Sequence, residues 1–593
     1  MEDKKPGMLY DAAREALDRL LGVGTNATGD GLTMKALLLD NQTLEMMTVL
    51  FSQTQLLERG VFHVHTIATA AAATGAKIKF LKAVTWLRPT PESLRSLAAE
   101  LSTVQRYPSY TLGFSHVVPT EGLHALAMAD HSELVKDVVE CFVDFVVINR
   151  ELALAPLPAR IPRLTNRDAE ATRIASAVSS LCLTLRRRGR IRVQNTSADA
   201  RKVAAELLGM FGSEPDVFDA TSRVGGGEAL ILIVDRSIDP VAPLLTPWTY
   251  QSMLHEHIGV VANTVTLPGQ KPEDVYVMSP FQDSFFSKNM FSNWGDLCVN
   301  VRNFVEEYRD AMQGTGTGKD RSTASLEDLR NAVANFGQNK LMSALAVKHV
   351  GAVTHLSDVV RSRKLFDISN LEQDMLADSN PADQMQRLTT LAADPAIERR
   401  DILRLCMIYA ARYESKPGAA ATTRTDELLV SSPPADRDTL VKYRDYCRVG
   451  LSQPFTSAAL FQSTGVVSSV LSFMKGMPDV ENMLTHHEPA IKTYLTQAIN
   501  GKLSSEHFPF VSGPAPPAGW RPKDVILVMT CGATYDEAMF VSRFNNSATP
   551  ANATVGAAAA AQAAAADAPQ CYLCASEMLS SRSFMDLLKG GAN

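Results

Sequence analysis

The stretch LILIVDRSIDPVAPLLTPWTYQSMLHEH, residues 230–257, joins an apolar run to a group of charges, prolines and aromatic side chains. Leu230–Val234 has the length and the branched apolar side chains of a buried strand. Asp235, Arg236 and Asp239 follow at its end. These charges either begin an active site or hold the fold together.

The charges after this strand read better as a structural cluster than as a reactive one, because no cofactor loop or nucleophile accompanies them. One guanidinium can donate to both carboxylates, which offsets the cost of burying all three groups. The following prolines fix the path of the chain, and the aromatic pair anchors the next helix. We predict an interdomain lock formed by Asp235, Arg236, Asp239, Pro240, Trp248 and Tyr250. The alternative is a nucleotide-dependent or hydrolytic α/β enzyme that uses the Asp235/Arg236/Asp239 cluster.

Length and composition bound the class of protein. A chain of 593 residues predicts three or four domains at about 150 residues each. Apolar residues make up 46% and charged residues 21%, as in soluble globular proteins. The net charge of -6 gives no global reason to bind nucleic acid. No apolar run reaches the length of a membrane-spanning helix and the N-terminus lacks a secretory signal, so a cytosolic protein is expected.

Sites for metals and cofactors are not predicted. The eight cysteines are scattered, and the C-x-x-C pair of Cys571 and Cys574 lacks the further ligands of a zinc site. The glycines and lysine of residues 314–319 resemble a phosphate loop, but Asp320 replaces the hydroxyl that binds magnesium. The arginines of residues 186–192 read as a solvated helix end, with contact to anionic lipid as a minority hypothesis. We predict no catalytic residues, metal or cofactor.

Residues 34–150 alternate short apolar segments with amphipathic helical ones. This alternation predicts parallel strands joined by crossover helices, and therefore an α/β doubly wound domain. A helix over residues 10–21 precedes it, within an N-terminal extension of residues 1–33. The expected strands begin at Met34 and span Val61–Ile67, Ala83–Leu87, Tyr110–Val118 and Cys141–Ile148.

A second α/β domain is predicted to be split by a helical insertion. Its first part holds a helix over residues 168–189 and the strands 190–194 and 230–234, and its second part holds strands at 524–530 and 571–575 and a last helix. About 270 residues of helical periodicity lie between, too many for a loop. A helix begins near Ser325, a long one spans residues 338–363, and the alanine-rich tract 549–568 is a surface excursion.

Two of these stretches resemble the signatures of the SM family, the Sec-one/Munc-eighteen-like regulators of SNARE assembly. DRSIDPVAPLLTPWTYQSMLHE fits the family pattern D-R-x-x-D-P-x-x-P-L-L-x-x-W-T-Y-Q, and DVILVMTCGATYDEA resembles a second hallmark. WLRPTPESL and NMLTHHEPAIKTYL look most like the vacuolar-protein-sorting forty-five branch. Two departures are Cys531 in place of the usual first glycine of the second hallmark, and Gly337 where many relatives have a proline.

The resemblance implies a three-domain arch without catalytic activity. Its α/β domain 1 would span residues 34–150, its split α/β domain 2 residues 151–250 and 489–593, and its mostly helical domain 3 residues 251–488. The implied partners are a Golgi or endosomal syntaxin-type Qa-SNARE and a SNARE complex that includes a vesicle R-SNARE. The implied protein is a cytoplasmic monomer held at endosome or trans-Golgi membranes through SNAREs, and it templates SNARE assembly before vesicle fusion.

The resemblance also implies two binding surfaces. A pocket on domain 1 would take the N-terminal peptide of the syntaxin, on a predicted helix pair over residues 120–142. A hairpin of domain 3, residues 299–363, would align SNARE helices in helix-in-groove fashion. The peptide pocket is assigned to Leu123, Leu126, Val135, Val138 and Val139. The SNARE groove is assigned to Met342, Leu345, His349 and Val350.

Overall fold

Two compact units make up the chain in the computed structural model. Unit 1 comprises Met1–Asp235, Gln497–Cys531 and Val541–Glu577, and unit 2 comprises Arg236–Thr496, Gly532–Phe540 and Met578–Asn593. The three-domain division stays a prediction. The structure describes residues 9–23, 34–68, 77–156, 167–219, 228–269, 271, 275–313, 340–377, 380–414, 424–430, 432–451, 487–511, 513, 516–517, 519–547 and 569–589.

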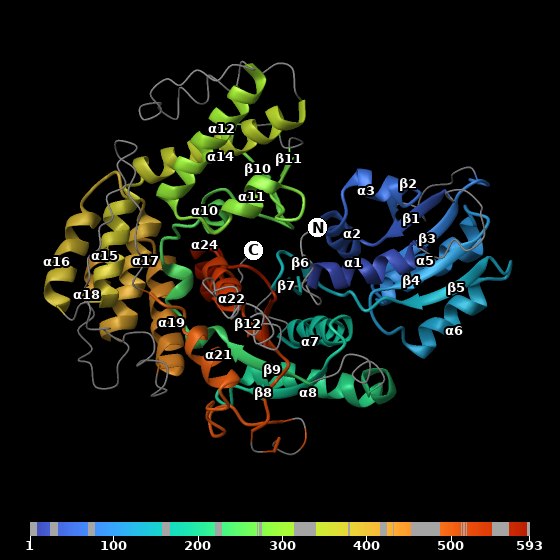
Figure 1. The fold of residues 1–593 in the computed structure, drawn as a ribbon. Coiled ribbons are helices and arrows are strands. Elements are labelled where there is room, and N and C mark those ends of the chain that lie inside the picture. Colours follow the sequence, from blue (N-terminus) through green and yellow to red (C-terminus); the bar gives the residue numbers. More distant parts are fainter. Residues whose placement is uncertain are drawn as a thin grey trace, which may run out of the picture. The chain divides into compact units, whose positions relative to one another are not determined.

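The first sheet of unit 1 is parallel throughout, with strand order β2-β1-β3-β4-β5 (Figure 1). Its strands are short, the central ones are largely buried, and helices connect several of them, which confirms the predicted α/β class. The strands are β1 (Lys35–Leu39), β2 (Val61–Thr66), β3 (Lys82–Leu87), β4 (Tyr110–Phe114) and β5 (Val135–Glu140).

The edge strand β5 differs from the prediction. The expected helix pair over residues 120–142 is one helix, α6 (Thr120–Ala129), followed by this strand. Its valines are β-branched and favour the pleated conformation over a helix. Of the expected strand Cys141–Ile148, only β6 (Val146–Val147) is a strand, and it belongs to the second sheet.

Helices cover both faces of the first sheet. Leu112 of β4 shares a core with Leu97 of α5 and Leu126 of α6. The other face meets α1, because a Cβ added to Gly113 of β4 would lie 2.5 Å from Cδ2 of Leu20. The helix assigned to an N-terminal extension is therefore part of the unit 1 core. The helical elements around this sheet are α1 (Leu9–Leu20), α2 (Asn41–Leu50), α3 (Gln53–Glu58), α5 (Pro91–Ala99), η1 (Glu100–Val104) and α6.

The second sheet brings together strands from both ends of the chain, in the order β6-β7-β13-β12-β9-β8. Neighbouring strands in this sheet are parallel, except that β6 and β7 are antiparallel. The central strand β12 is buried along its whole length. This confirms that the predicted second α/β fold is interrupted in sequence. Besides β6, its strands and their flanking helices are β7 (Leu152–Leu154), α7 (Arg167–Thr184), β8 (Arg188–Val193), α8 (Ala198–Ser213), β9 (Glu228–Asp235), β12 (Asp524–Thr530) and β13 (Gln570–Ala575).

Unit 2 is mostly helical and has one large apolar core, as predicted for the insertion. A two-stranded antiparallel ribbon, β10 (Thr264–Thr266) with β11 (Val275–Val277), adds to the helices. Its helical elements are η2 (Arg236–Ile238), η3 (Ala242–Leu244), α10 (Tyr250–His257), α11 (Ser284–Asn289), α12 (Trp294–Gln313), α14 (Lys340–Ser362), α15 (Leu365–Ala377), α16 (Pro381–Ala392), α17 (Arg399–Tyr409), η4 (Ala410–Glu414), α18 (Arg424–Leu428), α19 (Pro434–Leu451) and α24 (Ser581–Lys589).

Two helices contribute residues to both units, α21 (Ile491–Ile499) and α22 (Tyr535–Ser547). The long helix expected over residues 338–363 is present as α14. The predicted helix start at Ser325, Gly337 and the alanine-rich tract 549–568 lie outside the described residues. Among the described helices, none combines the length and the apolar character needed to cross a bilayer.

Candidate functional site

Apolar side chains of α6 and of the edge strand β5 are exposed. Leu123 is 37% exposed and Val138 is 50% exposed, while Val135 is half-buried. Val138 pairs with Leu112, whose side chain lies in the core beneath α6, so Val138 lies on the α6 face of the sheet. We call Leu123, Val135 and Val138 the α6–β5 surface.

Two residues predicted for the same pocket do not belong to this surface. Leu126 is 4% exposed and packs in the core, so it has almost no area to offer a peptide. Val139 pairs with Gly113, which faces α1, so Val139 lies on the opposite face of the sheet from Val138. The prediction placed all five residues on helices, and the alternation of side chains along β5 corrects it.

The prediction of a SNARE groove on α14 is wrong for two of its four residues. His349 and Val350 are buried, at 0% and 2% exposure, and so present no surface to a partner helix. Ala346, Val350 and Val353 recur at i, i+4 and i+7 and form the stripe that packs into the unit 2 core. Leu345 is half-buried, and the side chain of Met342 lies outside the described residues.

His349 instead belongs to a buried polar cluster. Its Nδ1 lies 2.9 Å from Tyr250 Oη and its Nε2 lies 3.0 Å from Asp283 Oδ2. Burial raises the pKa of Asp283, but His349 and Lys348 outweigh it and lower that pKa to about 2. An ionised carboxylate only accepts, so Nε2 donates to Asp283. Burial lowers the pKa of His349, and a neutral ring then accepts from Tyr250 at Nδ1.

The charges after β9 form a cluster, but with partners other than the predicted ones. Arg236 does not donate to the carboxylates of Asp235 and Asp239. Its Nη1 and Nη2 donate to Oε2 and Oε1 of Glu537, at 2.6 and 2.7 Å, and its Nε donates to the carbonyl oxygen of Asp239 at 3.0 Å. A fork-to-fork pair satisfies the planar guanidinium better than two separate aspartates on the same short turn.

The Asp239 carboxylate pairs with His487. His487 Nε2 lies 3.1 Å from Asp239 Oδ2, an ion-pair contact without hydrogen-bond geometry. The amides of Ala242 and Ala490 donate to the two carboxylate oxygens at 3.0 and 3.1 Å. Burial raises the pKa of Asp239, but His487, Arg236 and the Ala490 amide outweigh it and lower that pKa to about 2. The carboxylate is therefore held ionised in the core.

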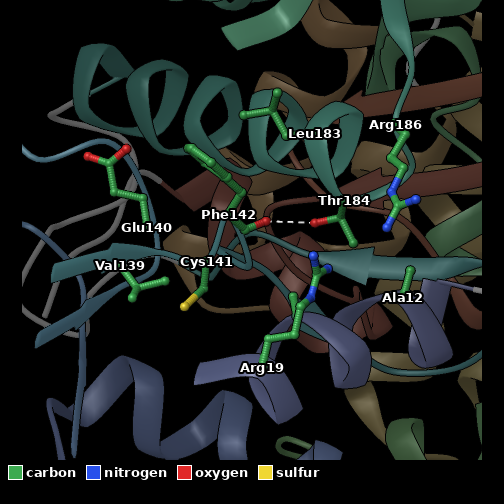
Figure 2. Close-up of a pocket in the computed structure, with 10 residues that line it drawn as sticks. Ala12, Arg19, Val139, Glu140, Cys141, Phe142, Leu183, Thr184 and Arg186 are labelled. Atoms are coloured by element: carbon green, nitrogen blue, oxygen red, sulfur yellow. Dashed lines mark hydrogen bonds between the residues drawn. The ribbon is translucent and has the colours of Figure 1, made fainter. Parts of the chain in front are cut away.

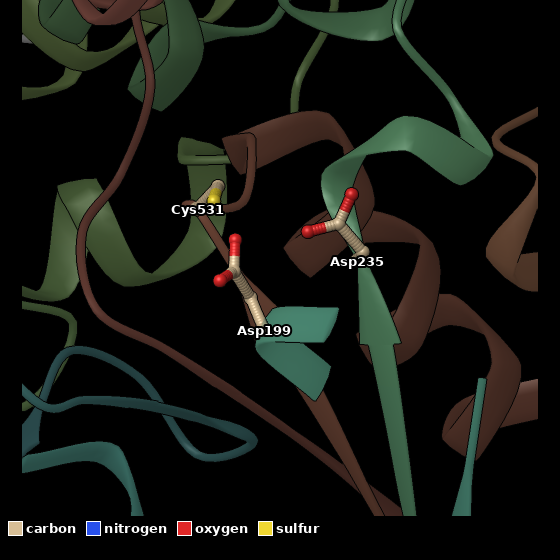
Figure 3. Close-up of side chains that lie close together, drawn as sticks. All are labelled: Asp199, Asp235 and Cys531. Atoms are coloured by element: carbon tan, nitrogen blue, oxygen red, sulfur yellow. The ribbon is translucent and has the colours of Figure 1, made fainter. Parts of the chain in front are cut away.

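Asp235 ends β9 and accepts a hydrogen bond of 2.9 Å from the hydroxyl of Thr530, its neighbour at the end of β12. Figure 3 shows its carboxylate near the carboxylate of Asp199 and the thiol of Cys531. One ligand atom from each of these three residues lies within 4.8 Å of the others. Each of them has further interactions within the chain, so the grouping by itself does not define a metal site.

The other members of the predicted lock are buried in unit 2. Trp248 donates from Nε1 to Ser369 at 2.9 Å and stacks on Phe366 with ring centroids 4.8 Å apart. The carbonyl oxygen of Pro240 accepts from the Tyr443 hydroxyl at 3.2 Å. All the lock residues are thus buried and bonded. That they join two domains stays a prediction.

The enzyme alternative is not supported by this arrangement. Arg236 and Asp239 are 0% exposed and their polar atoms are taken by other protein groups, so neither can meet a substrate. The arginine-rich run is a solvated helix end only in part. Arg186 follows α7 and is 45% exposed, whereas β8 begins at Arg188. In β8, Arg190 pairs with Glu228 at 2.6 Å and the buried Arg192 donates to the carbonyl oxygen of Phe508 at 2.7 Å.

Two residues of the charge network were missed in the sequence. Glu537 lies within the quoted hallmark DVILVMTCGATYDEA, and His487 lies within the quoted stretch NMLTHHEPAIKTYL. The signal for Glu537 was an acidic side chain on the first turn of a helix that directly follows a buried strand. Such a carboxylate needs a cation, and Arg236 after the neighbouring strand supplies it.

Comparisons with known proteins agree with this geometry. The sequence profile of the Sec1 family matches residues 35–587. The vacuolar protein sorting-associated protein 45 homolog of Arabidopsis thaliana is 30% identical over 557 residues, which cover 91% of this chain and 93% of that protein. The corresponding protein of Rattus norvegicus is 30% identical, over 87% of this chain and 88% of its own.

Solved structures give the same result. The SM protein Vps45 in complex with the Qa SNARE Tlg2 superposes with a TM-score of 0.78 and 30% identity, over 98% of both chains. The Unc18–syntaxin 1 complex of Monosiga brevicollis has a TM-score of 0.72 at 15% identity and supports the fold alone. The chain belongs to the Sec1 family of SM proteins.

Proposed function

We propose that this chain is a SNARE-binding regulator of vesicle fusion that binds a Qa-SNARE and catalyses no reaction. The observation that carries the proposal is full-length similarity to a Vps45 that was solved with the Qa SNARE Tlg2. Relatives named for vacuolar protein sorting support a role at endosomes or the trans-Golgi network. We include in the proposal that the monomer engages a SNARE bundle with a vesicle R-SNARE.

The α6–β5 surface is the proposed site for a short N-terminal peptide of the Qa-SNARE. Leu123 and Val138 offer an apolar patch on which one anchoring side chain gains about 1.5 to 3 kcal/mol by burial. The Cys141 amide donates to Phe114 of β4, so the backbone of Val138, three residues earlier, points away from β4. An extended peptide can therefore add to the side of β5 that has no neighbouring strand among the described residues.

The test is a calorimetric titration with an N-terminal peptide of a Qa-SNARE from the same organism. Leu123→Arg and Val138→Arg place a charge on the patch and are expected to weaken binding by about tenfold or more. Val441→Arg on α19 is the matched control, because Val441 is 49% exposed and Val138 is 50% exposed. Undiminished binding by both site variants would reject the site. Failure of the full chain to bind any Qa-SNARE of its organism would reject the function.

A further inference from the structure

A cavity of about 570 Å³ lies in unit 1, on the sheet face opposite the α6–β5 surface. Val139 and Glu140 of β5 contribute to it, and the rest comes from α1, from the two residues after β5, from the end of α7 and from Arg186 after it (Figure 2). Its volume is in the range of sites that bind small ligands or peptide side chains, about 300–1,000 Å³. It is lined by Ala12, Ala16, Arg19, Val139, Glu140, Cys141, Phe142, Leu183, Thr184 and Arg186.

Two arginines from different elements converge on this cavity. Figure 2 shows the guanidinium groups of Arg19, on α1, and Arg186, after α7, pointing toward one another. Glu15 is the carboxylate near both, at 3.9 Å from Arg19 and 3.6 Å from Arg186. The side chains are well exposed, at 63% for Arg19, 45% for Arg186 and 63% for Glu15. These long contacts therefore hold the arginines only weakly. A better-placed anion can displace Glu15.

Glu140, whose carboxylate belongs to the cavity lining, does not compete for these arginines. Glu140 Oε1 accepts from the amide of Val118 at 2.8 Å, and Figure 2 shows its side chain turned away from Arg19 and Arg186. The apolar part of the lining comes from Ala12 and Ala16 of α1, from Leu183 at the end of α7, and from Val139, Cys141 and Phe142. The cavity thus combines a cationic pair with an apolar wall.

The backbone around the cavity is held in a costly conformation. Phe142 and Arg186 have φ of 52° and 56°, in the left-handed region that favours glycine. Thr184 Oγ1 donates to the carbonyl oxygen of Phe142 at 2.6 Å and ties the two segments together. Such strain persists only where neighbouring contacts over-determine it, and it concentrates at ligand-binding positions. This hydrogen bond therefore fixes the two wall segments to one another.

We propose that this cavity binds an acidic peptide segment. One carboxylate of the segment lies between Arg19 and Arg186, and an adjacent apolar side chain packs against Ala12, Ala16 and Phe142. Membrane-binding patches gather about four to eight basic residues, whereas this cavity has two arginines with Glu15 and Glu140 beside them, so a lipid surface fits it less well. The proposal stands apart from the proposed function, since it uses the other face of the sheet.

The first test is selection of a random heptapeptide phage library on the full chain. The same library is selected in parallel on the double variant Arg19→Gln/Arg186→Gln. The wild-type chain is expected to enrich peptides with Asp or Glu beside Leu, Ile or Phe, and the double variant is expected to lose them. Both arginines are exposed, so the melting temperature of the double variant should match that of the wild type.

The second test measures affinity by fluorescence anisotropy with one enriched peptide and its Asn/Gln counterpart. Removal of either arginine, or of the peptide carboxylate, is expected to weaken binding by about tenfold. Glu15→Gln removes the internal competitor and is expected to tighten binding. Arg188→Gln is the control, because Arg188 is an exposed arginine paired with Asp219 and does not line the cavity.

Two results would overturn the proposal. One is enrichment of peptides without acidic residues, or of peptides that bind the double variant equally well. The other is the absence of peptide binding together with binding to phosphatidylserine vesicles that the double variant loses. The second result would assign the arginine pair to a lipid headgroup.

Discussion

Arg236 and Glu537, 301 positions apart in the chain, form a bidentate ion pair in which both side chains are fully buried. Arg236 follows β9, and Glu537 lies on the first turn of α22, just after β12. The amide of Thr534 also donates to Glu537, at 2.9 Å. The two hallmark stretches of the sequence are therefore two halves of one interaction in unit 2.

Removal of one partner of this pair is expected to destabilise the chain strongly. Arg236→Ala leaves Glu537 charged and buried without a counter-ion, at a cost of about 3 to 5 kcal/mol. Arg188→Ala is the control, because it removes an exposed pair and should cost less than about 1 kcal/mol. Denaturant unfolding followed by circular dichroism measures both. If Arg236→Ala instead has the unfolding free energy of the wild type but has lost an activity, then Arg236 takes part in that activity directly.

The double variant Arg236→Met/Glu537→Leu separates the charge from the volume of this pair. Apolar replacement of both partners is often neutral or stabilising, so the double variant is expected to be more stable than Arg236→Ala. The same unfolding measurement checks this. Equal destabilisation of the two variants would show that the polar contacts to Thr534 and Asp239 outweigh the ion pair.

The pair of His487 and Asp239 is expected to make stability depend on pH. Burial lowers the pKa of His487, but Asp239 outweighs it and raises that pKa. A raised folded pKa gives stability that is complete below the unfolded value of about 6.5 and is lost as pH rises through the folded value. The melting-temperature difference between wild type and His487→Gln should therefore be larger at about pH 6 than at about pH 9.

The acidic partner gives the opposite sign. The pKa of Asp239 is lowered to about 2, so its stabilisation is present above about pH 4 and is lost as pH falls through about 2. Asp239→Asn should therefore be less stable than the wild type at neutral pH, and the two should become equally stable only in strong acid. A His487→Gln difference that stays constant from about pH 6 to about pH 9 would contradict the ion pair.

Leu123 and Leu126, one helical turn apart on α6, should behave as surface and core. Leu126→Ala is expected to cost about 2 to 5 kcal/mol of unfolding free energy, since it leaves a cavity in the core of the first sheet. Leu123→Ala should change stability by less than about 0.5 kcal/mol and instead weaken peptide binding. Thermal unfolding and calorimetric titration of both variants check this. Equal loss of stability would place Leu123 in the core.

Gly113→Ala tests whether α1 packs against the first sheet. Its new Cβ would lie 2.4 Å from the carbonyl oxygen of Thr85 and 2.5 Å from Cδ2 of Leu20. The strand and the helix must separate, at a cost of about 1 to 3 kcal/mol or more. The double variant Gly113→Ala/Leu20→Ala should not regain the stability of the wild type, because the carbonyl oxygen of Thr85 stays in place. Full rescue, measured by thermal unfolding, would show that α1 alone causes the clash.

Much of the fold could be predicted because the hydrophobic pattern is clear where strands are central. Leu230–Val234 and Val525–Met529 are continuous apolar runs, and both lie in buried strands of the second sheet. The pattern failed at β5, which is an edge strand with polar residues between its valines. Alternation there is too short to separate from helical spacing, and only pairing with β4 decides it.

The candidate site was predictable in location but not in the identity of its contacts. The sequence identified Leu123 and Val138 as candidate contacts, while the sheet face on which Val138 lies depends on the register of β5 against β4. The charge cluster was likewise placed at Arg236 without Glu537, since a partner about 300 residues away leaves no local spacing to read. Long-range pairing in a folded chain is a tertiary property.

The adjacent valines of β5 make two interaction faces depend on one strand register. Val138 and Val139 lie on opposite faces of the sheet, so one belongs to the α6–β5 surface and the other to the cavity wall. A one-residue slip of β5 past β4 would place either Asp137 opposite Leu112 or Glu140 opposite Gly113. Either slip would put a carboxylate where one of the two faces now has a valine, so a change in the length of the α6–β5 connection that shifts the register would disrupt one of them.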